Sequence, residues 1–246
     1  MAVYDIGLFT HRGVVRSRNE DAIFASGTIF QGDQRDVISM RLAGPQSILI
    51  ADGIGSQPEG GLASRTALQF LTRDAGRLQT LAGCEAALHA ANERLYELMD
   101  DPRRIGMGTT VAGLVLQDVA VITFNVGDSR AYHLGRGGLM KLTHEDVFVA
   151  GPEGKQSDRS HAITQALGGS EFPLAIVPHV SVGSPMHLGD RFLLCTDGLT
   201  DALDDSDLES LLRLSTTPVI ITQKLVREAI LAGSRDNISV VVGVCS

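Results

Sequence analysis

The segment "ILIADGIGS" (48–56) carries an apolar run straight into the dipeptide Asp52-Gly53. The chain repeats this pattern in "FLLCTDGLTD" (192–201), where a second apolar run ends in Asp197-Gly198. Apolar runs of this kind favour buried strands, and Asp-Gly is a common turn sequence. The two segments therefore predict two strands that end in acidic turns, and they raise the question of whether the two carboxylates meet.

Short segments rich in Val, Ile, Thr and Phe recur along the chain with few residues between them, which favours antiparallel meanders over βαβ units. The predicted strands are 3–10, 46–52, 109–117, 119–127, 130–135, 139–143, 179–183, 190–197 and 237–244. Apolar residues at helical spacing predict two pairs of helices, at 59–74 with 83–99 and at 206–214 with 218–232. This order of elements predicts an α+β fold in which sheets pack together and helix pairs lie outside them.

The ends of the later helices carry recognisable signals. Ser206 is the expected N-cap of the third helix, and Thr217, Pro218 and Gly233 are the expected cap, first turn and stop of the fourth. Segment 27–45 remains a candidate hairpin, and segment 144–161 is predicted to be a polar surface loop. Because no repeat, low-complexity tract or linker interrupts the pattern, we expect residues 1–246 to form a single domain.

Composition excludes several classes of protein. Hydrophobic residues make up 43% of the 246 positions, which is enough for a sizeable core, and the formal net charge of −8 argues against nucleic acid as the main partner. The three cysteines are widely spaced and form no CxxC, which disfavours a disulfide framework or a zinc site built on thiolates. The sequence shows neither a signal peptide nor an apolar run of membrane-spanning length, so we expect a cytoplasmic protein with no membrane segment.

Acidic residues stand at the ends of apolar strands or beside Gly and Asn. They are Asp21, Asp52, Asp128, Asp197 and Asp236. Taken singly, each is more readily explained as a turn residue. If they converge, their charges repel one another unless a divalent cation lies between them, and an all-oxygen ligand set selects Mg²⁺ or Mn²⁺.

The combination resembles the metal-dependent serine/threonine protein phosphatases of type 2C, the PPM group, and in particular the stand-alone bacterial catalytic domains. The matching motifs run in the family's order through nearly the whole chain: "GVVRSRNEDA" (13–22), "LIADGIGS" (49–56), "GLAS" (61–64), "GMGTT" (106–110), "NVGDSRAY" (125–132), "LT" (142–143), "TQALGG" (164–169), "DRFLLCTDGLTD" (190–201) and "SRDNISVVV" (234–242). The resemblance implies a four-layer α-β-β-α sandwich of two antiparallel sheets flanked by pairs of helices.

The resemblance also implies a metal centre with two Mn²⁺ or Mg²⁺ ions. Asp52 would bridge the two ions, the backbone carbonyl of Gly53 would bind one of them, and Asp197 and Asp236 would complete the other. Asp128, with Asp197, matches a position that can hold a third ion in bacterial relatives. Two ions about 3.5–4 Å apart can hold a water between them and aim it at phosphorus.

Other positions match residues around these ions. Glu20 and Asp21 would hold metal-bound waters, and Arg16 would bind the phosphate. Without the resemblance, Arg16 is more readily interpreted as a surface residue. Thr109 and Thr110 either bond metal waters or simply begin a strand.

The implied activity is hydrolysis of phosphoserine and phosphothreonine in proteins, opposing a Ser/Thr kinase, by a monomeric enzyme. Two alternatives stay open: a catalytically silent binding or regulatory member, and a small-molecule phosphomonoesterase. Against the first, the metal ligands Asp52, Asp197 and Asp236 are all present.

Some positions depart from the family's pattern. Ile54 stands where some eukaryotic members carry a His that serves as a candidate general acid. His144 and His161 are alternatives for that role, although loop histidines are more often plain surface residues. Segment 144–161 is a short counterpart of the family's flap, which leaves the choice of substrate open.

Overall fold

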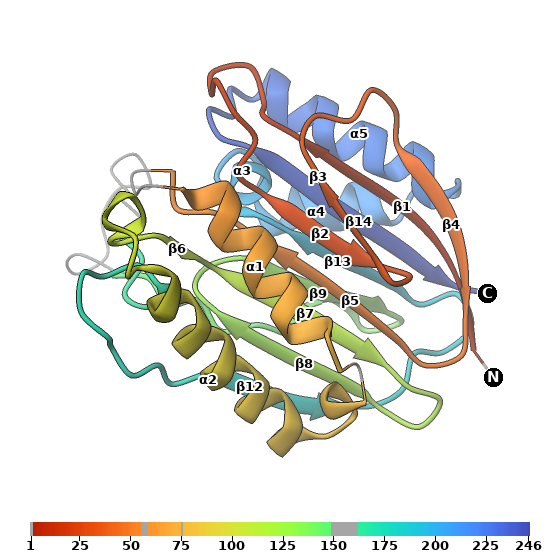
Figure 1. Ribbon diagram of the computed structural model, residues 1–246. Coiled ribbons are helices and arrows are strands. Elements are labelled where there is room, and N and C mark those ends of the chain that lie inside the picture. The colour runs from red at the N-terminus through yellow and green to blue at the C-terminus, as the bar shows by residue number, and fades with distance from the viewer. Residues whose placement is uncertain (1, 56–58, 75, 149–161) are drawn as a thin grey trace.

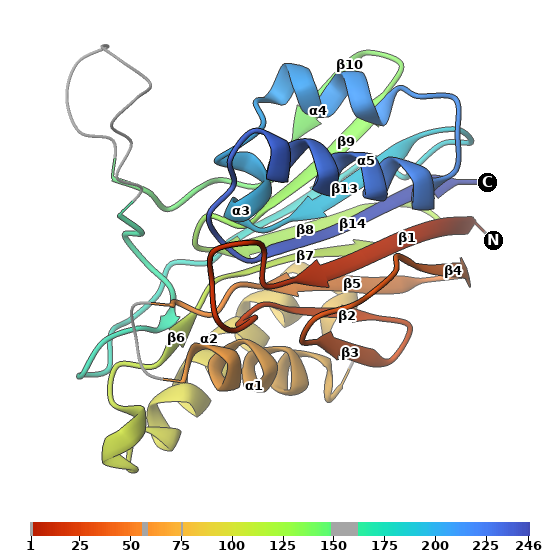
Figure 2. The same ribbon diagram turned by 90° about the horizontal axis from the view of Figure 1, so that it is seen from above.

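Two antiparallel β-sheets lie face to face in the computed structural model, and helices cover the outer face of each sheet (Figures 1 and 2). The structure describes residues 2–55, 59–74, 76–148 and 162–246. Seen from above, the layers follow one another as helices α4 and α5, the first sheet, the second sheet, and helices α1 and α2 (Figure 2). The predicted four-layer α-β-β-α sandwich is confirmed.

The first sheet has the strand order β10-β9-β13-β14-β1-β4. In chain order its strands are β1 (Val3–His11), β4 (Ile38–Ala43), β9 (Arg130–Gly135), β10 (Gly138–Lys141), β13 (Arg191–Cys195) and β14 (Ile238–Cys245). The first and last strands of this set, β1 and β14, pair along eight residues, from Tyr4 opposite Cys245 to His11 opposite Ile238. This pairing brings the two ends of the chain together in the middle of the sheet.

The second sheet has the strand order β12-β8-β7-β5-β2-β3. Its strands are β2 (Ala22–Ala25), β3 (Thr28–Gln31), β5 (Gln46–Ala51), β7 (Val111–Leu116), β8 (Val121–Val126) and β12 (His179–Gly183). Two further strands, β6 (Gly108–Thr109) and β11 (Leu167–Gly168), form a small separate ladder.

Helices α1 (Gly60–Thr72) and α2 (Leu81–Leu98) pack on the second sheet, and α4 (Asp205–Leu212) and α5 (Pro218–Leu231) pack on the first (Figure 2). The remaining helical segments are short: the single turn α3 (Asp197–Thr200) and the 3₁₀ turns η1 (Arg77–Gln79) and η2 (Pro102–Arg104). In the described part of the chain, no helix is both long enough and apolar enough to cross a membrane.

The four layers enclose three cores, because each sheet buries both of its faces. On β7, Val111 and Val115 join the core beneath α1 and α2, while Ala112, Leu114 and Leu116 join the core between the sheets. The third core lies between the first sheet and α4 and α5. A strand buried on both faces reads as a continuous apolar run, which is why these strands were visible in the sequence.

Three local predictions were wrong. The N-cap of α4 is Asp204, which accepts hydrogen bonds from the N–H groups of Ser206 and Asp207, both at 2.9 Å, so Ser206 lies inside the helix. Segment 27–45 is not a hairpin, because β3 pairs with β2 in the second sheet and β4 pairs with β1 in the first. The predicted strand 190–197 ends at Cys195, and Asp197 begins α3.

The helix end signals of α5 are confirmed. Thr217 caps the helix by accepting a hydrogen bond from the N–H of Ile220, and Pro218 is its first residue. Gly233 follows the helix with a positive φ of 95°, as expected of a C-terminal stop. Residues 149–161 of the predicted surface loop lie outside the described residues.

Each sheet contains a phenylalanine ring that covers a glycine on the neighbouring strand. Phe192 of β13 lies opposite Gly243 of β14, and Phe124 of β8 lies opposite Gly113 of β7. A Cβ added at either glycine would overlap the aromatic ring. Both rings are fully buried, so they have no free space to move into.

We therefore expect Gly243→Ala to lower the free energy of unfolding by about 1–3 kcal/mol, the usual cost of overpacking a core. Urea denaturation of the purified protein measures this. Gly137→Ala is the matched control, because a Cβ there meets no atom within 4 Å, and it should leave stability unchanged. Equal stability of the two variants would contradict the packing argument.

Candidate functional site

Asp52 and Asp197 follow strands of different sheets and lie near each other at one end of the sandwich. Asp52 comes directly after β5 of the second sheet, and Asp197 begins α3 after β13 of the first sheet. Strands β5 and β13 contact each other across the interface between the sheets. The pKa of Asp52 is raised well above its ordinary value, first by burial and then by repulsion from neighbouring carboxylates that include Asp21 and Asp197. The two acidic turns therefore lie within electrostatic reach of each other.

The glycine of each Asp-Gly pair is required by close packing. A Cβ on Gly53 would overlap the carbonyl group of Gly60 at the start of α1. A Cβ on Gly198 would overlap the carbonyl oxygen of Asn237. Each glycine thus allows another backbone segment to approach its aspartate closely.

The carbonyl of Gly53 is left unused by its β-bridge. Gly53 pairs with Thr109, and the hydrogen bonds of this bridge run from Ile54 N to Gly108 O (3.0 Å) and from Thr110 N to Asp52 O (2.9 Å). Gly53 and Thr109 are therefore a non-hydrogen-bonded pair, in which the N–H and C=O of each residue point away from the partner strand. This carbonyl is thus available as a ligand, as the resemblance implies.

Two threonines hold the backbone of Asp52 in place. Thr109 Oγ1 donates to the carbonyl of Asp52 at 2.7 Å, and the N–H of Asp52 donates to Thr110 Oγ1 at 3.2 Å. These contacts give the threonines a role that the sequence analysis did not consider, which is to position Asp52.

Asp21 is fully buried beneath the cluster. Its Oδ2 accepts hydrogen bonds from Thr196 Oγ1 (3.0 Å) and Ser239 Oγ (2.7 Å). Burial raises the pKa of Asp21 to about 7, and repulsion from Asp236 adds to the effect, although the two hydroxyl donors oppose it. Burial therefore disfavours the charged form of Asp21.

Three aspartates of the cluster each keep one buried oxygen without a hydrogen-bond partner. These atoms are the Oδ1 atoms of Asp21, Asp128 and Asp197. Burial followed by repulsion from Asp128 and Asp236 raises the pKa of Asp197 well above its ordinary value, and burial followed by repulsion from Asp201 raises that of Asp128 to about 6. Buried, unpaired carboxylate oxygens are unfavourable unless a cation binds them. An all-oxygen donor set of this kind fits Mn²⁺ or Mg²⁺.

Arg16 forms an ion pair with Asp236 at the open side of the cluster. Arg16 Nη2 donates to Asp236 Oδ2 at 2.5 Å, and this bond raises the pKa of the guanidinium. The other oxygen of Asp236 accepts from the N–H of Asn237 at 2.8 Å. Glu20 lies beside Arg16, since a Cβ on Gly55 would be 3.1 Å from Glu20 Oε2 and 3.4 Å from Arg16 Nη1. Burial raises the pKa of Glu20, while Arg16 opposes the shift.

Asn237 is a positioning residue that the sequence analysis missed. Its Nδ2 donates to the carbonyls of Arg12 (3.1 Å) and Arg18 (2.8 Å), and its Oδ1 accepts from the N–H of Glu20 at 2.8 Å. It thereby fixes both ends of the loop that carries Arg16. The sequence signal that could have identified Asn237 is its position between Asp236 and the apolar strand β14.

Similarity to known proteins identifies the family of this chain. The sequence model of the family described as protein phosphatase 2C matches residues 33–226. The chain belongs to the protein phosphatase 2C family. The serine/threonine protein phosphatase PstP of Mycobacterium tuberculosis is 31% identical over 246 residues, which cover 94% of this chain and 43% of PstP. The chain thus spans less than half the length of that relative.

Other members of the protein phosphatase 2C family match over nearly their full length. The serine/threonine phosphatase stp of Listeria innocua is 26% identical over 250 residues, which cover 95% of this chain and 92% of that protein. A crystal structure of M. tuberculosis PstP superposes with a TM-score of 0.78 at 27% identity, covering 99% of both chains. A structure of the PstP catalytic domain in complex with two manganese ions gives a TM-score of 0.77 at 26% identity, covering 100% of this chain and 99% of that one.

The departures from the protein phosphatase 2C pattern lie at the edge of the site. The Ile54 side chain packs beside Gly108 and Gly169, so this position carries an apolar contact and no proton donor. His144 is exposed and faces the ring of His179, with centroids 4.5 Å apart. His161 lies outside the described residues.

The raised pKa values predict how the stability of the metal-free protein depends on pH. Asp21 and Asp128, with pKa values of about 7 and 6, stay protonated in the folded chain where unfolded carboxyls, with pKa about 4, are already ionised. The folded state then binds more protons than the unfolded state. The free energy of unfolding should therefore fall as the pH rises from about 4 to about 7, by up to about 1.4 kcal/mol per pH unit for each group.

Urea unfolding with a chelator at a series of pH values measures this slope. Asp21→Asn should make the slope shallower, whereas Asp100→Asn, at an exposed position after α2, should not change it. If the unaltered protein and both variants show the same dependence of stability on pH, Asp21 is not the group responsible for it.

Proposed function

We propose that this chain is a metal-dependent phosphatase that hydrolyses phosphoserine and phosphothreonine in proteins. The observation that carries the proposal is the convergence of four buried aspartates next to the exposed Arg16. They are Asp21, Asp52, Asp128 and Asp197, and all but Asp52 keep one buried oxygen without a partner. The relatives named as serine/threonine phosphatases, one of them seen with two manganese ions, support the same reading.

Each residue of the cluster has a distinct task in this proposal. Asp52 would be shared between two Mn²⁺ or Mg²⁺ ions, with the Gly53 carbonyl on one ion and Asp197 and Asp236 on the other. The unpaired Oδ1 of Asp128 makes it the candidate for a third ion together with Asp197. When bound, these ions supply a nucleophile of lowered pKa and neutralise the charge that develops on the phosphate.

The remaining acidic residues support these ligands. Asp21 is held by Thr196 and Ser239 through Oδ2 and keeps its buried Oδ1 without a partner, so it can orient waters. Glu20 lies between Arg16 and the Gly53–Gly55 segment and can do the same from the open side.

Arg16 would hold the phosphate group of the substrate. Its guanidinium can donate two parallel hydrogen bonds to two phosphate oxygens and leave the ester oxygen free. In the structure this guanidinium binds Asp236. Phosphate and Asp236 therefore compete for Arg16, and binding of a cation by Asp236 would release Arg16 toward the substrate.

The surroundings of Arg16 favour a protein substrate over a small phosphomonoester. Val14 and Val15, just before Arg16, are 64% and 56% exposed and offer apolar contacts beside the phosphate. We further propose that residues 1–246 act as one catalytic domain, monomeric and cytoplasmic, that opposes a Ser/Thr kinase. A silent regulatory member would be expected to lack a metal ligand, and none is missing here.

Removal of a metal ligand should abolish turnover. With a phosphothreonine peptide and Mn²⁺, we expect hydrolysis that a chelator eliminates and that Asp236→Ala reduces by more than about 100-fold. Residues that only hydrogen-bond to metal ligands already change metal affinity or activity by about 10–100-fold, so loss of a ligand should have a larger effect. Phosphate release measures both effects, with Asp100→Ala as the control that keeps full activity. Turnover that survives chelation, or an active Asp236→Ala variant, would exclude the two-metal mechanism, and faster turnover of small phosphomonoesters would favour the alternative substrate class.

Loss of the phosphate-binding cation should weaken substrate binding. Arg16→Ala should lower kcat/KM for the phosphopeptide by at least about 10–100-fold, the effect of losing a single hydrogen bond to a charged group, mainly through a higher KM. Arg16→Lys should recover only part of the loss, because a lysine cannot make the paired contact. The control Arg18→Ala removes the same charge two residues away and should have little effect, so equal losses in the two alanine variants would argue against a specific role for Arg16.

A further inference from the structure

A second group of potential metal ligands, made of His144, Asp146 and His179, lies outside the carboxylate cluster. Each of the three side chains places one donor atom within 4.8 Å of the donors of the other two. His179 Nε2 lies 2.8 Å from Asp146 Oδ1, and the rings of His144 and His179 are 4.5 Å apart. The proposed phosphatase reaction assigns no role to any of them.

We propose that His144, Asp146 and His179 bind one zinc-class transition-metal ion. Two imidazole nitrogens and one carboxylate oxygen form a ligand set that suits Zn²⁺, whereas the all-oxygen cluster around Asp52 suits Mn²⁺ or Mg²⁺. Three protein ligands leave the fourth tetrahedral position open to water or to another ligand. The inference does not depend on the proposed phosphatase activity.

The donor distances are close to what a single ion requires. Zinc bonds of about 2.0–2.2 Å place neighbouring ligand atoms of a tetrahedral site about 3.3 Å apart. The His179–Asp146 pair, now 2.8 Å apart, has to open by about 0.5 Å to reach this spacing, and rotation of the exposed His144 ring can bring in the third donor, which lies within 4.8 Å of the other two. The adjustment is therefore a small opening of the His179–Asp146 pair and rotation of the exposed His144 side chain.

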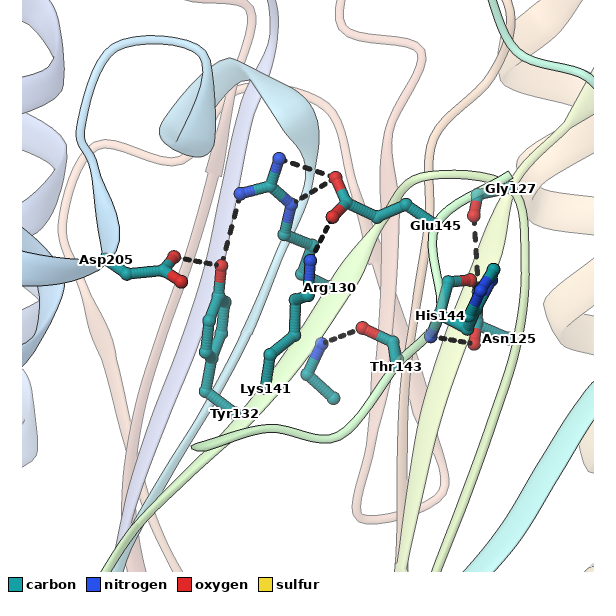
Figure 3. Close-up of polar contacts among 10 residues, drawn as sticks. Asn125, Gly127, Arg130, Tyr132, Lys141, Thr143, His144, Glu145 and Asp205 are labelled. Atoms are coloured by element: carbon teal, nitrogen blue, oxygen red, sulfur yellow. Dashed lines mark hydrogen bonds and ion pairs between the residues drawn. The ribbon is translucent and has the colours of Figure 1, made fainter. Parts of the chain in front are cut away.

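The backbone on both sides of the two histidines is fixed by Asn125. Asn125 lies opposite His179 in the pairing of β8 with β12. Its side chain donates to the carbonyl of His144 at 2.6 Å and accepts from the N–H of His144 at 3.2 Å, and Figure 3 shows the two residues side by side. One buried residue therefore holds the backbone positions of both histidines.

Asp146 is held equally firmly. Its Oδ2 accepts from the N–H of Gly127 at 2.8 Å, and its own N–H donates to the Gly127 carbonyl at 3.1 Å. These bonds leave Oδ1 facing His179. They also connect the proposed zinc ligand to the residue before Asp128 of the carboxylate cluster.

The residue between the two ligands points away from them. Glu145 is turned toward the first sheet, where it binds Arg130 at 2.6 Å and also contacts Lys141 (Figure 3). Because the charge of Glu145 is neutralised there, the alternation along 144–146 presents one imidazole and one carboxylate on the same side. Pre-organised donors of this kind are what a metal site requires beyond the correct residue types.

Competition for Zn²⁺ against a chromogenic chelator tests the proposal on the full chain. The protein should bind one more tight Zn²⁺ than His144→Ala or His179→Gln, with at least a 10–100-fold loss of affinity at that site in each variant. A glutamine at position 179 can still donate to Asp146, so a merely structural role of the pair would be retained in His179→Gln. His89→Ala, at an exposed position on α2, is the matched control and should bind Zn²⁺ as the unaltered chain does.

Two further arms separate this site from the carboxylate cluster. The site should persist in Asp236→Ala, and Co²⁺ should give the intense visible absorption of a tetrahedral nitrogen-containing site that disappears in His144→Ala. Unchanged Zn²⁺ affinity in both histidine variants, or loss of the same ion in Asp236→Ala, would overturn the proposal. None of these readouts needs turnover, so failure of the phosphatase proposal would be seen separately in the peptide assay.

Discussion

Repulsion among carboxylates buried at one end of the sandwich is the constraint on which the rest of the site depends. Burial and mutual repulsion raise the pKa values of Asp21, Asp52, Asp128 and Asp197. The fold tolerates this arrangement because three large cores stabilise it elsewhere. A cation among the carboxylates would remove the repulsion and supply the chemistry, so the same feature that weakens the metal-free protein suits it to bind metal.

The surrounding polar residues turn this repulsion into a defined geometry. Thr109 and Thr110 hold the backbone of Asp52, and Thr196 and Ser239 hold Asp21. Asn237 fastens the loop of Arg16 to the start of β14. The contacts of Asp21 join the two sheets and those of Asn237 join the two ends of the chain, so the site depends on correct packing of the whole sandwich.

A second connection joins the carboxylate cluster to the proposed zinc ligands. Asp146 binds both backbone groups of Gly127, and Gly127 precedes Asp128. Residues 144 and 145 are fixed as well, because Asn125 binds the backbone of His144 and Arg130 binds the side chain of Glu145 (Figure 3). An ion held by His144, Asp146 and His179 would therefore stiffen the turn that carries Asp128. The two proposed metal sites would be connected through this turn although they share no ligand.

The sequence by itself determined the main strands and the four longer helices, because apolar periodicity and turn chemistry involve neighbouring residues. The cap of α4 was misplaced, since Ser206 and Asp204 carry the same local signal and only the helix bonds distinguish them. Segment 27–45 was misread because the choice of partner strand is not local. The resemblance named the acidic residues, but only the tertiary structure decided that Asp52 lies within electrostatic reach of Asp197 and that Arg16 reaches Asp236, 220 positions away. The physical reason is that such contacts follow from strand order and sheet packing, which place distant segments together and leave no periodic signal in the chain.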